Sequence, residues 1–147
     1  LRAINFDAKS AFQFAILQGK QAKDFEIVAC VTDAGSMGPW CLAKLGESLP
    51  EGTYRLSGAE PGIAALGWLL AQHRFTAYKS APAEPRGDRI SLTGRPAERE
   101  GCIRLAQASA WVRDLLDTPA ADMGPAEIES AARTLAEEFG AKVNVVS

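Results

Sequence analysis

The chain has 147 residues, a formal net charge of −2 at pH 7, 47% hydrophobic residues and 23% charged residues. This length and balance suit one globular domain, or one domain and the start of a second. A weakly acidic chain with no apolar run near 18 residues disfavours binding to nucleic acid, which calls for a basic face, and insertion into a membrane.

Strands and helices are predicted to alternate from the first elements onward. Residues 1–24 are ambiguous between strand and helix. The segment FEIVACV at 25–31 is rich in β-branched residues between two aspartates, which predicts a buried strand. A glycine-rich loop follows at 33–39, and Pro39 stands where a short helix could begin.

The next elements, up to residue 92, continue this alternation. A short strand is expected at 53–56, after a turn. A helix is expected at 60–75, and its residues are apolar nearly all round, which predicts heavy burial. The segment 79–88 is rich in proline and charge and is expected to be an exposed loop, followed by a short strand at 90–92.

A long amphipathic helix is predicted at 97–117. Its apolar residues share one face at three-to-four spacing: Cys102, Leu105, Ala108, Val112, Leu115 and Leu116. Pro119 ends it, because proline has no amide hydrogen to donate and disfavours helix in the residue before it.

A second helix is predicted to begin at Pro125, capped by Gly124, and to stop at Gly140 in the left-handed conformation. It is expected to pack through the apolar residues Ile128, Ala131, Leu135 and Phe139. A final strand is expected at 142–146.

Alternating strands and helices indicate an α/β fold. We expect a small mixed sheet with flanking helices, then a long connecting helix and the start of a second α/β unit. The corresponding divisions are 1–96 for the first domain, 97–118 for the connecting helix, and 119–147 for the second unit.

Two sequence blocks resemble the leucyl (cytosol) aminopeptidases, the M17 metallopeptidases. RDLLDTPAADMGP at 113–125 is similar to the segment that joins their two domains, although Asp117 and Ala121 replace the usual asparagines. EGTYRL and then ALGWLLAQHRFTAYK, within 51–79, are similar to a strand and helix of their first domain. The blocks stand in the family's order, and the first fifty residues match no family pattern.

This resemblance implies a particular place for the chain in a longer enzyme. In the family the catalytic residues follow the junction, and two divalent metal ions, zinc or manganese, are held by Asp, Glu and Lys side chains. The chain would then be a macro-like, non-catalytic N-terminal domain with the truncated start of the catalytic domain. It would contain no catalytic residue, metal ligand or cofactor, and would be inactive alone.

The same resemblance implies the properties of the parent protein. It would be a cytoplasmic homohexamer that hydrolyses N-terminal amino acids from peptides. The chain's partners would be its own C-terminal catalytic domain and its neighbouring subunits, and its role would be assembly and active-site access. An alternative from another class is a free-standing macro-type module that binds a small ligand or a nucleotide.

The candidate functional residues gather at the expected domain junction: Arg113, Asp114, Asp117, Pro119, Asp122, Gly124 and Pro125. The three aspartates could be metal ligands, but helix caps and solvated turns account for them more simply. Trp111 lies off the apolar stripe of its helix. Either it contacts the catalytic domain or another subunit, or the 79–88 loop covers it.

Other candidate sites have weak support. His73 could be a general base, but a solvated histidine at a helix C-terminus is the preferred interpretation. Three cysteines without short spacing favour reduced, buried or half-buried thiols over a zinc site. The 33–39 loop lacks a phosphate-binding glycine pattern and lysine, so it is interpreted as a plain turn. The segment around Asp33, at 31–35, is superficially similar to the family's metal-binding motif but lacks its Glu and Arg residues, so Asp33 is not interpreted as a metal ligand.

Overall fold

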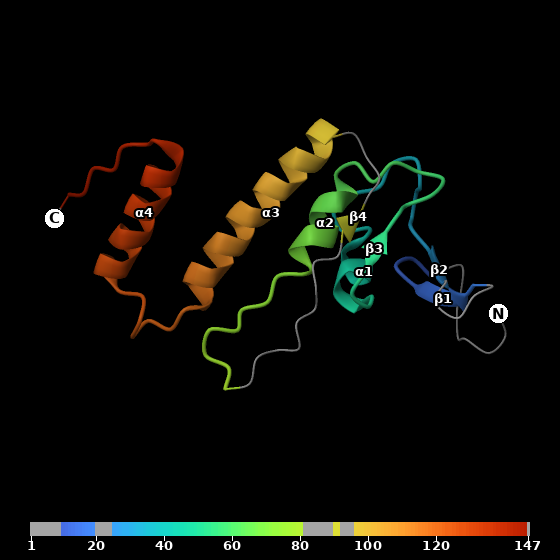
Figure 1. Cartoon of the computed structure of the whole chain (residues 1–147), viewed down its shortest axis with the longest axis horizontal. Helices are drawn as coiled ribbons and strands as arrows, with labels where there is room; N and C mark the ends of the chain where they lie inside the picture. Colours follow the sequence, from blue (N-terminus) through green and yellow to red (C-terminus); the bar gives the residue numbers. More distant parts are fainter. Residues whose placement is uncertain (1–9, 20–24, 81–89, 92–95, 147) are drawn as a thin grey trace. The chain divides into compact units, whose positions relative to one another are not determined.

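The computed structural model describes residues 10–19, 25–80, 90–91 and 96–146. The chain divides into two compact units, Leu1–Ala108 and Ser109–Ser147, and the point of division falls within one helix. The described elements, coloured along the chain in Figure 1, are β1 (Phe14–Gln18), β2 (Phe25–Ala29), α1 (Ala43–Ser48), β3 (Thr53–Tyr54), α2 (Ala64–Leu70), β4 (Ile90–Ser91), α3 (Pro96–Asp117) and α4 (Pro125–Phe139). The chain is therefore a mixed α/β protein. The divisions expected after residues 96 and 118 stay a prediction.

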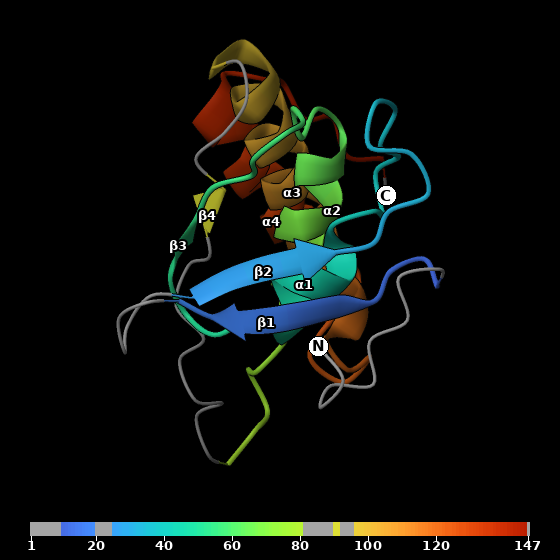
Figure 2. The ribbon, with the colours of Figure 1, turned by 90° about the vertical axis from the view of Figure 1, so that its right-hand side faces the viewer.

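The strands form two separate pairs. β1 and β2 are antiparallel, with Phe14 opposite Ala29 and Gln18 opposite Phe25, and Figure 2 shows them side by side. β3 and β4 are parallel, with Thr53 opposite Ile90. Among the described residues, the single mixed sheet that the sequence predicts is thus divided into two two-stranded sheets.

A small apolar core holds the first unit together. Its buried members come from α1, α2 and the turns before and after α1: Leu42, Leu45, Leu49, Ala64 and Trp68. One face of each strand pair lies on this core, since Phe14, Ile27 and Tyr54 pack against it. Burial of these side chains supplies the main favourable term for folding the unit.

Two glycines allow α2 to pack closely against α1 and against the turn that precedes α1. A Cβ atom at Gly67 would overlap the carbonyl oxygen of Pro39, and one at Gly46 would overlap the carbonyl oxygen of Trp68. Neither position has room for a side chain, because the obstructing atoms belong to the backbone. The glycines therefore set how closely the two helices pack.

The expected strand at 25–31 is confirmed over 25–29, but its expected burial is wrong. Phe25 and Val28 are 47% and 40% exposed, whereas Ile27 and Ala29 are half-buried. Val28 points away from the core, because alternate side chains of a strand point to opposite faces, whereas Phe25 shares the face of Ile27 and Ala29 but lies at the first position of the strand. The expected strand at 53–56 is also shorter, at two residues.

Both early helices are shorter than expected. α1 begins at Ala43 rather than at Pro39, because residues 39–42 form turns. α2 spans only the middle of the expected 60–75 helix. Gly62 has a positive φ of 46°, which interrupts a right-handed helix before Ala64, and a tight turn follows Leu70. The expected heavy burial is confirmed for the core-facing part of α2, including Trp68 at 4% exposure.

The two long helices have the expected bounds, but their apolar faces are not buried as expected. Cys102 is buried in the first half of α3, whereas Leu105 and Leu116 on the same stripe are 53% and 78% exposed. In α4, Ile128, Leu135 and Phe139 are exposed as well. The apolar faces of the two helices are therefore largely exposed.

Some expected elements are absent or fall outside the description. Residues 142–146 form no strand, because a strand needs a hydrogen-bonded neighbour and no described segment pairs with this one. Most of the expected loop at 79–88, Leu92 of the expected 90–92 strand, and residues 1–9 and 20–24 lie outside the described residues.

Candidate functional site

The junction segment is a helix end, a turn and a capped helix start within the second unit. The N–H and hydroxyl of Thr118 both donate to the carbonyl oxygen of Asp114, at 3.1 and 2.7 Å, which closes the last turn of α3. The N–H of Asp122 donates to the carbonyl oxygen of Pro119 at 2.8 Å and so forms a turn. The expected break at Pro119 is confirmed.

The start of α4 uses the chemistry that the sequence predicts. Gly124 is the N-cap in an extended conformation, and Pro125 occupies the first helical position. The N–H of Gly124 donates to Oε2 of Glu127 at 3.0 Å. Glu127 thereby provides one half of a capping box and a negative charge near the positive end of the helix dipole. Gly140 ends α4 with a φ of 64°.

The three junction aspartates are exposed and follow one another along the end of α3 and the turn. The hydrogen bonds described above use the main-chain groups of Asp114 and Asp122. Arg113 is half-buried. In the part of the chain that the structure describes, no three His, Cys, Asp or Glu side chains lie close enough to hold a metal ion. The described residues therefore do not fit a two-metal centre.

Trp111 is half-buried and lies in the part of α3 that belongs to the second unit. The loop at 79–88, its alternative cover, lies almost entirely outside the described residues. Both interpretations of Trp111 stay predictions.

The cysteines and the histidine are dispersed. All three cysteines are free, with Cys102 buried and its Sγ 3.9 Å from the carbonyl oxygen of Gly62, and with Cys30 and Cys41 half-buried. This confirms the expected half-buried and buried thiols. His73 is half-buried beyond the end of α2, and its carbonyl oxygen accepts a hydrogen bond from the Arg74 guanidinium.

The 33–39 loop has the geometry of a turn. The N–H of Gly35 donates to Oδ1 of Asp33 at 2.8 Å, the short local bond that aspartate commonly makes in turns. A small hollow beside the loop is lined by Glu60 and Glu98, with no lysine or arginine. Two carboxylates would repel a phosphate, so the hollow does not favour an anion.

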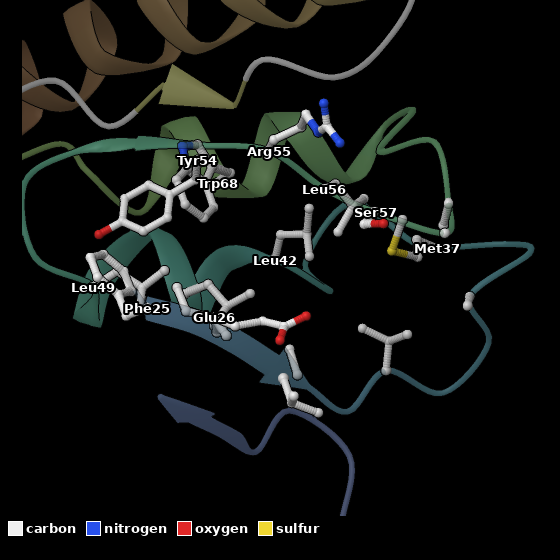
Figure 3. Close-up of a pocket in the computed structure, with 18 of the residues that line it drawn as sticks. Phe25, Glu26, Met37, Leu42, Leu49, Tyr54, Arg55, Leu56, Ser57 and Trp68 are labelled. Atoms are coloured by element: carbon white, nitrogen blue, oxygen red, sulfur yellow. The ribbon is translucent and has the colours of Figure 1, made fainter. Parts of the chain in front are cut away.

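A groove lies between β2 and the segment 53–59 in the first unit, with a cavity volume of about 750 Å³. Its floor is apolar and consists of Leu42, Leu45, Leu49 and Trp68 from α1, α2 and the turns around α1. Figure 3 shows Phe25 and Tyr54 together at one end of the groove and Met37 and Ser57 at the other.

The groove carries little charge that could bind a polar ligand. Figure 3 shows the Glu26 carboxylate directed into the groove, whereas the Arg55 guanidinium is directed away from it. The rings of Phe25 and Tyr54 meet edge to face, with centroids 6.0 Å apart. An apolar floor with one carboxylate suits an uncharged or extended apolar occupant better than a phosphate.

Sequence reasoning did not find this groove. Its lining comes from segments that are distant in the sequence, and no local pattern marks it. The EGTYRL block supplies part of one wall, through Thr53 to Leu56, but that block predicted a strand and not a cavity.

Among the described residues, no helix combines the length and apolar character required to cross a membrane.

Several curated relatives of the chain share the name probable cytosol aminopeptidase. The sequence is 33% identical over 103 residues to a probable cytosol aminopeptidase of Rhodococcus opacus, covering 62% of this chain and 20% of the relative. It is 33% identical over 90 residues to one of Mycobacterium ulcerans, covering 56% of this chain and 17% of the relative. One of Streptomyces coelicolor is 28% identical over 111 residues, covering 60% and 22%. The chain thus spans about a fifth of the length of these relatives.

Two solved structures share the fold. One is described as the bottromycin maturation enzyme BotP in complex with Mn, with a TM-score of 0.77, 21% identity, and coverage of 95% of this chain and 33% of that chain. The other is described as the bottromycin maturation enzyme BotP. It has a TM-score of 0.76 and 23% identity, and the match covers 95% of this chain and 34% of that chain. At this identity the likeness concerns the fold alone. No protein-family model matches the sequence.

Proposed function

Because the chain is 32 to 33% identical to several probable cytosol aminopeptidases over more than half of its length, we propose that it is the non-catalytic N-terminal domain, with the first part of the catalytic domain, of a metal-dependent leucyl aminopeptidase. The observation that carries this proposal is the sequence relationship to several cytosol aminopeptidases, each about five times longer than the aligned part. The parent enzyme would remove N-terminal amino acids from peptides.

The exposed apolar faces of the long helices support a role in assembly. Leu116 is 78% exposed and Phe139 is 71% exposed. Large apolar side chains that gather on a helix face commonly mark a surface that another domain or subunit covers. In the parent these faces, with Trp111, would contact the catalytic domain or a neighbouring subunit of a homohexamer. From there the domain would shape access to the active site.

The metal centre would lie outside this chain. A pair of divalent ions, zinc or manganese, would polarise the scissile carbonyl group in the parent. The presence of manganese in the description of one structure with this fold supports a divalent metal. The relatives' name, cytosol aminopeptidase, supports a cytosolic location. We also propose that the first domain has a macro-like topology.

The proposal is tested with leucine p-nitroanilide as substrate. We expect the complete gene product to hydrolyse it with added Mn²⁺ or Zn²⁺ and to lose activity with EDTA. We expect the 147-residue chain alone to be inactive under the same conditions. Activity of that chain would refute a non-catalytic role, and a metal-loaded, inactive complete protein would refute the aminopeptidase assignment.

A free-standing module that binds a small ligand or nucleotide is the second candidate. The observation in its favour is the groove, whose volume lies in the range of small-ligand sites, roughly 300 to 1,000 Å³. A thermal shift titration with adenosine, which carries no phosphate, tests it. A saturable rise in the melting temperature of the 147-residue chain, lost in Met37→Ala at the groove but kept in the exposed variant Trp40→Ala, would favour the module.

A further inference from the structure

The groove has a charged mouth above an apolar floor. Ile27 and Ala29 of β2 pack against the core, and successive side chains of a strand point to opposite faces. Glu26 therefore leaves β2 on the side away from the core, at the mouth of the groove, and Figure 3 shows its carboxylate directed into the groove. A ligand that reached the floor would lie next to this carboxylate.

The Glu26 carboxylate is accessible and has no partner among the residues that the structure describes. Glu26 is exposed, and none of those residues forms a hydrogen bond or an ion pair with its side chain. Arg55 also lines the groove, but its guanidinium group is directed away from it. The remaining lining residues are uncharged. The groove therefore presents one uncompensated negative charge, which favours a cation over an anion.

The groove also offers apolar surface for a ligand to cover. Phe25 is 47% exposed at one end of the groove, and its ring meets that of Tyr54 edge to face, with centroids 6.0 Å apart. Met37 is half-buried at the other end. An apolar group that covered Phe25 would remove exposed ring surface from water, which favours binding.

The carboxylate and the apolar surface together define the ligand. An ammonium group forms a charge-assisted hydrogen bond to a carboxylate, and such bonds are roughly twice as strong as those between neutral groups. A purely apolar ligand would take the carboxylate partly out of water without giving it a partner, which opposes binding. A metal ion would leave the apolar surface uncovered, and one carboxylate provides too few ligands for it. The ligand therefore combines an amine with an apolar body.

We propose that the groove binds a small amphipathic amine. Its ammonium group donates hydrogen bonds to the Glu26 carboxylate, and its apolar body lies over the floor against the ring of Phe25. The proposal rests on the second candidate function and deepens it, because it names the class of ligand that the module would take in the same groove. It does not depend on the aminopeptidase function, since every lining residue belongs to the first unit.

Isothermal titration calorimetry of the 147-residue chain with two matched probes tests the proposal. The probes are 4-phenylbutylamine and 4-phenylbutanol, which share an apolar body and differ in the charged group. We expect the amine to bind one to one with a dissociation constant below about 1 mM. We expect the alcohol to bind about tenfold more weakly, because it loses the charge-assisted hydrogen bond. Equal affinities of the two probes, or no binding of the amine, would overturn the proposal.

Variants at exposed positions locate the site. Glu26→Gln removes the charge and keeps the size of the side chain, so amine binding should weaken about tenfold and alcohol binding should not change. Glu138→Gln, at an exposed position of α4 outside the groove, changes the net charge equally and is the matched control. Phe25→Ala should weaken both probes by about threefold or more. Equal losses in Glu26→Gln and Glu138→Gln, or full binding in Phe25→Ala, would contradict the proposed site.

Two further titrations separate this proposal from its alternatives. Saturable binding of adenosine without binding of 4-phenylbutylamine would overturn the amine and leave the module in place. Binding of the amine without binding of adenosine supports the amine as the ligand class. The amide of the tripeptide Phe-Gly-Gly carries the same two groups on a peptide. If it binds at least tenfold more tightly than 4-phenylbutylamine, a peptide and not a small molecule is the ligand, and the proposal is overturned.

Discussion

Gly67 tests how the core of the first unit is packed. In an exposed helix interior, Gly→Ala stabilises a protein by about 1 kcal/mol, because alanine loses less backbone entropy. At Gly67 the new Cβ would overlap the carbonyl oxygen of Pro39, with the Pro39 carbonyl carbon only 3.0 Å away. The obstruction is backbone, so no side-chain rotation can relieve it, and α2 must move away from the turn that precedes α1.

The expected magnitude follows from these two effects. Overpacking a core costs about 1 to 3 kcal/mol, and a backbone obstruction belongs at the upper end. With the helix propensity gain subtracted, Gly67→Ala should lower the free energy of unfolding by about 2 kcal/mol. At roughly 3 °C per kcal/mol for a chain of this size, the melting temperature should fall by about 6 °C.

Gly101→Ala is the matched control. Gly101 lies in α3, and a Cβ there would meet no atom within 4 Å. The same substitution should therefore raise the melting temperature by about 3 °C. Both values are measured by thermal unfolding followed by circular dichroism at 222 nm. If Gly67→Ala stabilises the protein as Gly101→Ala does, the close approach of α2 to the turn that precedes α1 is wrong.

Three further predictions concern the core, the cap of α4 and the thiols. Trp68→Ala should lower the free energy of unfolding by about 3 to 5 kcal/mol in urea denaturation, because a buried aromatic side chain is lost; a loss below 1 kcal/mol would contradict its central place. Gly140→Ala should cost about 1 kcal/mol in the same assay, since its φ of 64° disfavours a side chain although space is open; an unchanged midpoint would argue against this cap. Iodoacetamide followed by mass spectrometry should label Cys102, which is 5% exposed, at least tenfold more slowly than Cys41; equal rates would disprove its burial.

The long helices could be predicted from the sequence because their ends depend on local chemistry. Pro119 and Pro125 act through their missing amide and fixed φ, and Gly140 acts through its tolerance of the left-handed conformation. These effects need no partner from elsewhere in the chain. The bounds of α3 and α4 therefore agree with the prediction within a residue.

Strands and burial were harder to predict because they depend on neighbours. Residues 142–146 have the composition of a strand, yet none is formed among the described residues because no neighbouring strand supplies hydrogen bonds. The apolar stripe of α3 shows the same limit. Its period predicts which residues share a face, but Leu116 is exposed because a covering surface is a property of the assembly and not of the helix.

Of the two candidate sites, one could be predicted from the sequence and the other could not. The junction from Arg113 to Pro125 was identifiable in the sequence, since its turn and cap residues act within a few positions of one another and their pattern resembles a known family. The groove between β2 and β3 was not, because it exists only where folding brings Phe25–Ala29 beside Thr53–Ala59 over an apolar floor. The sequence by itself determined where helices start and stop and which family the chain resembles. Only the tertiary structure decided which strands pair with one another, because pairing depends on which segments lie side by side in space.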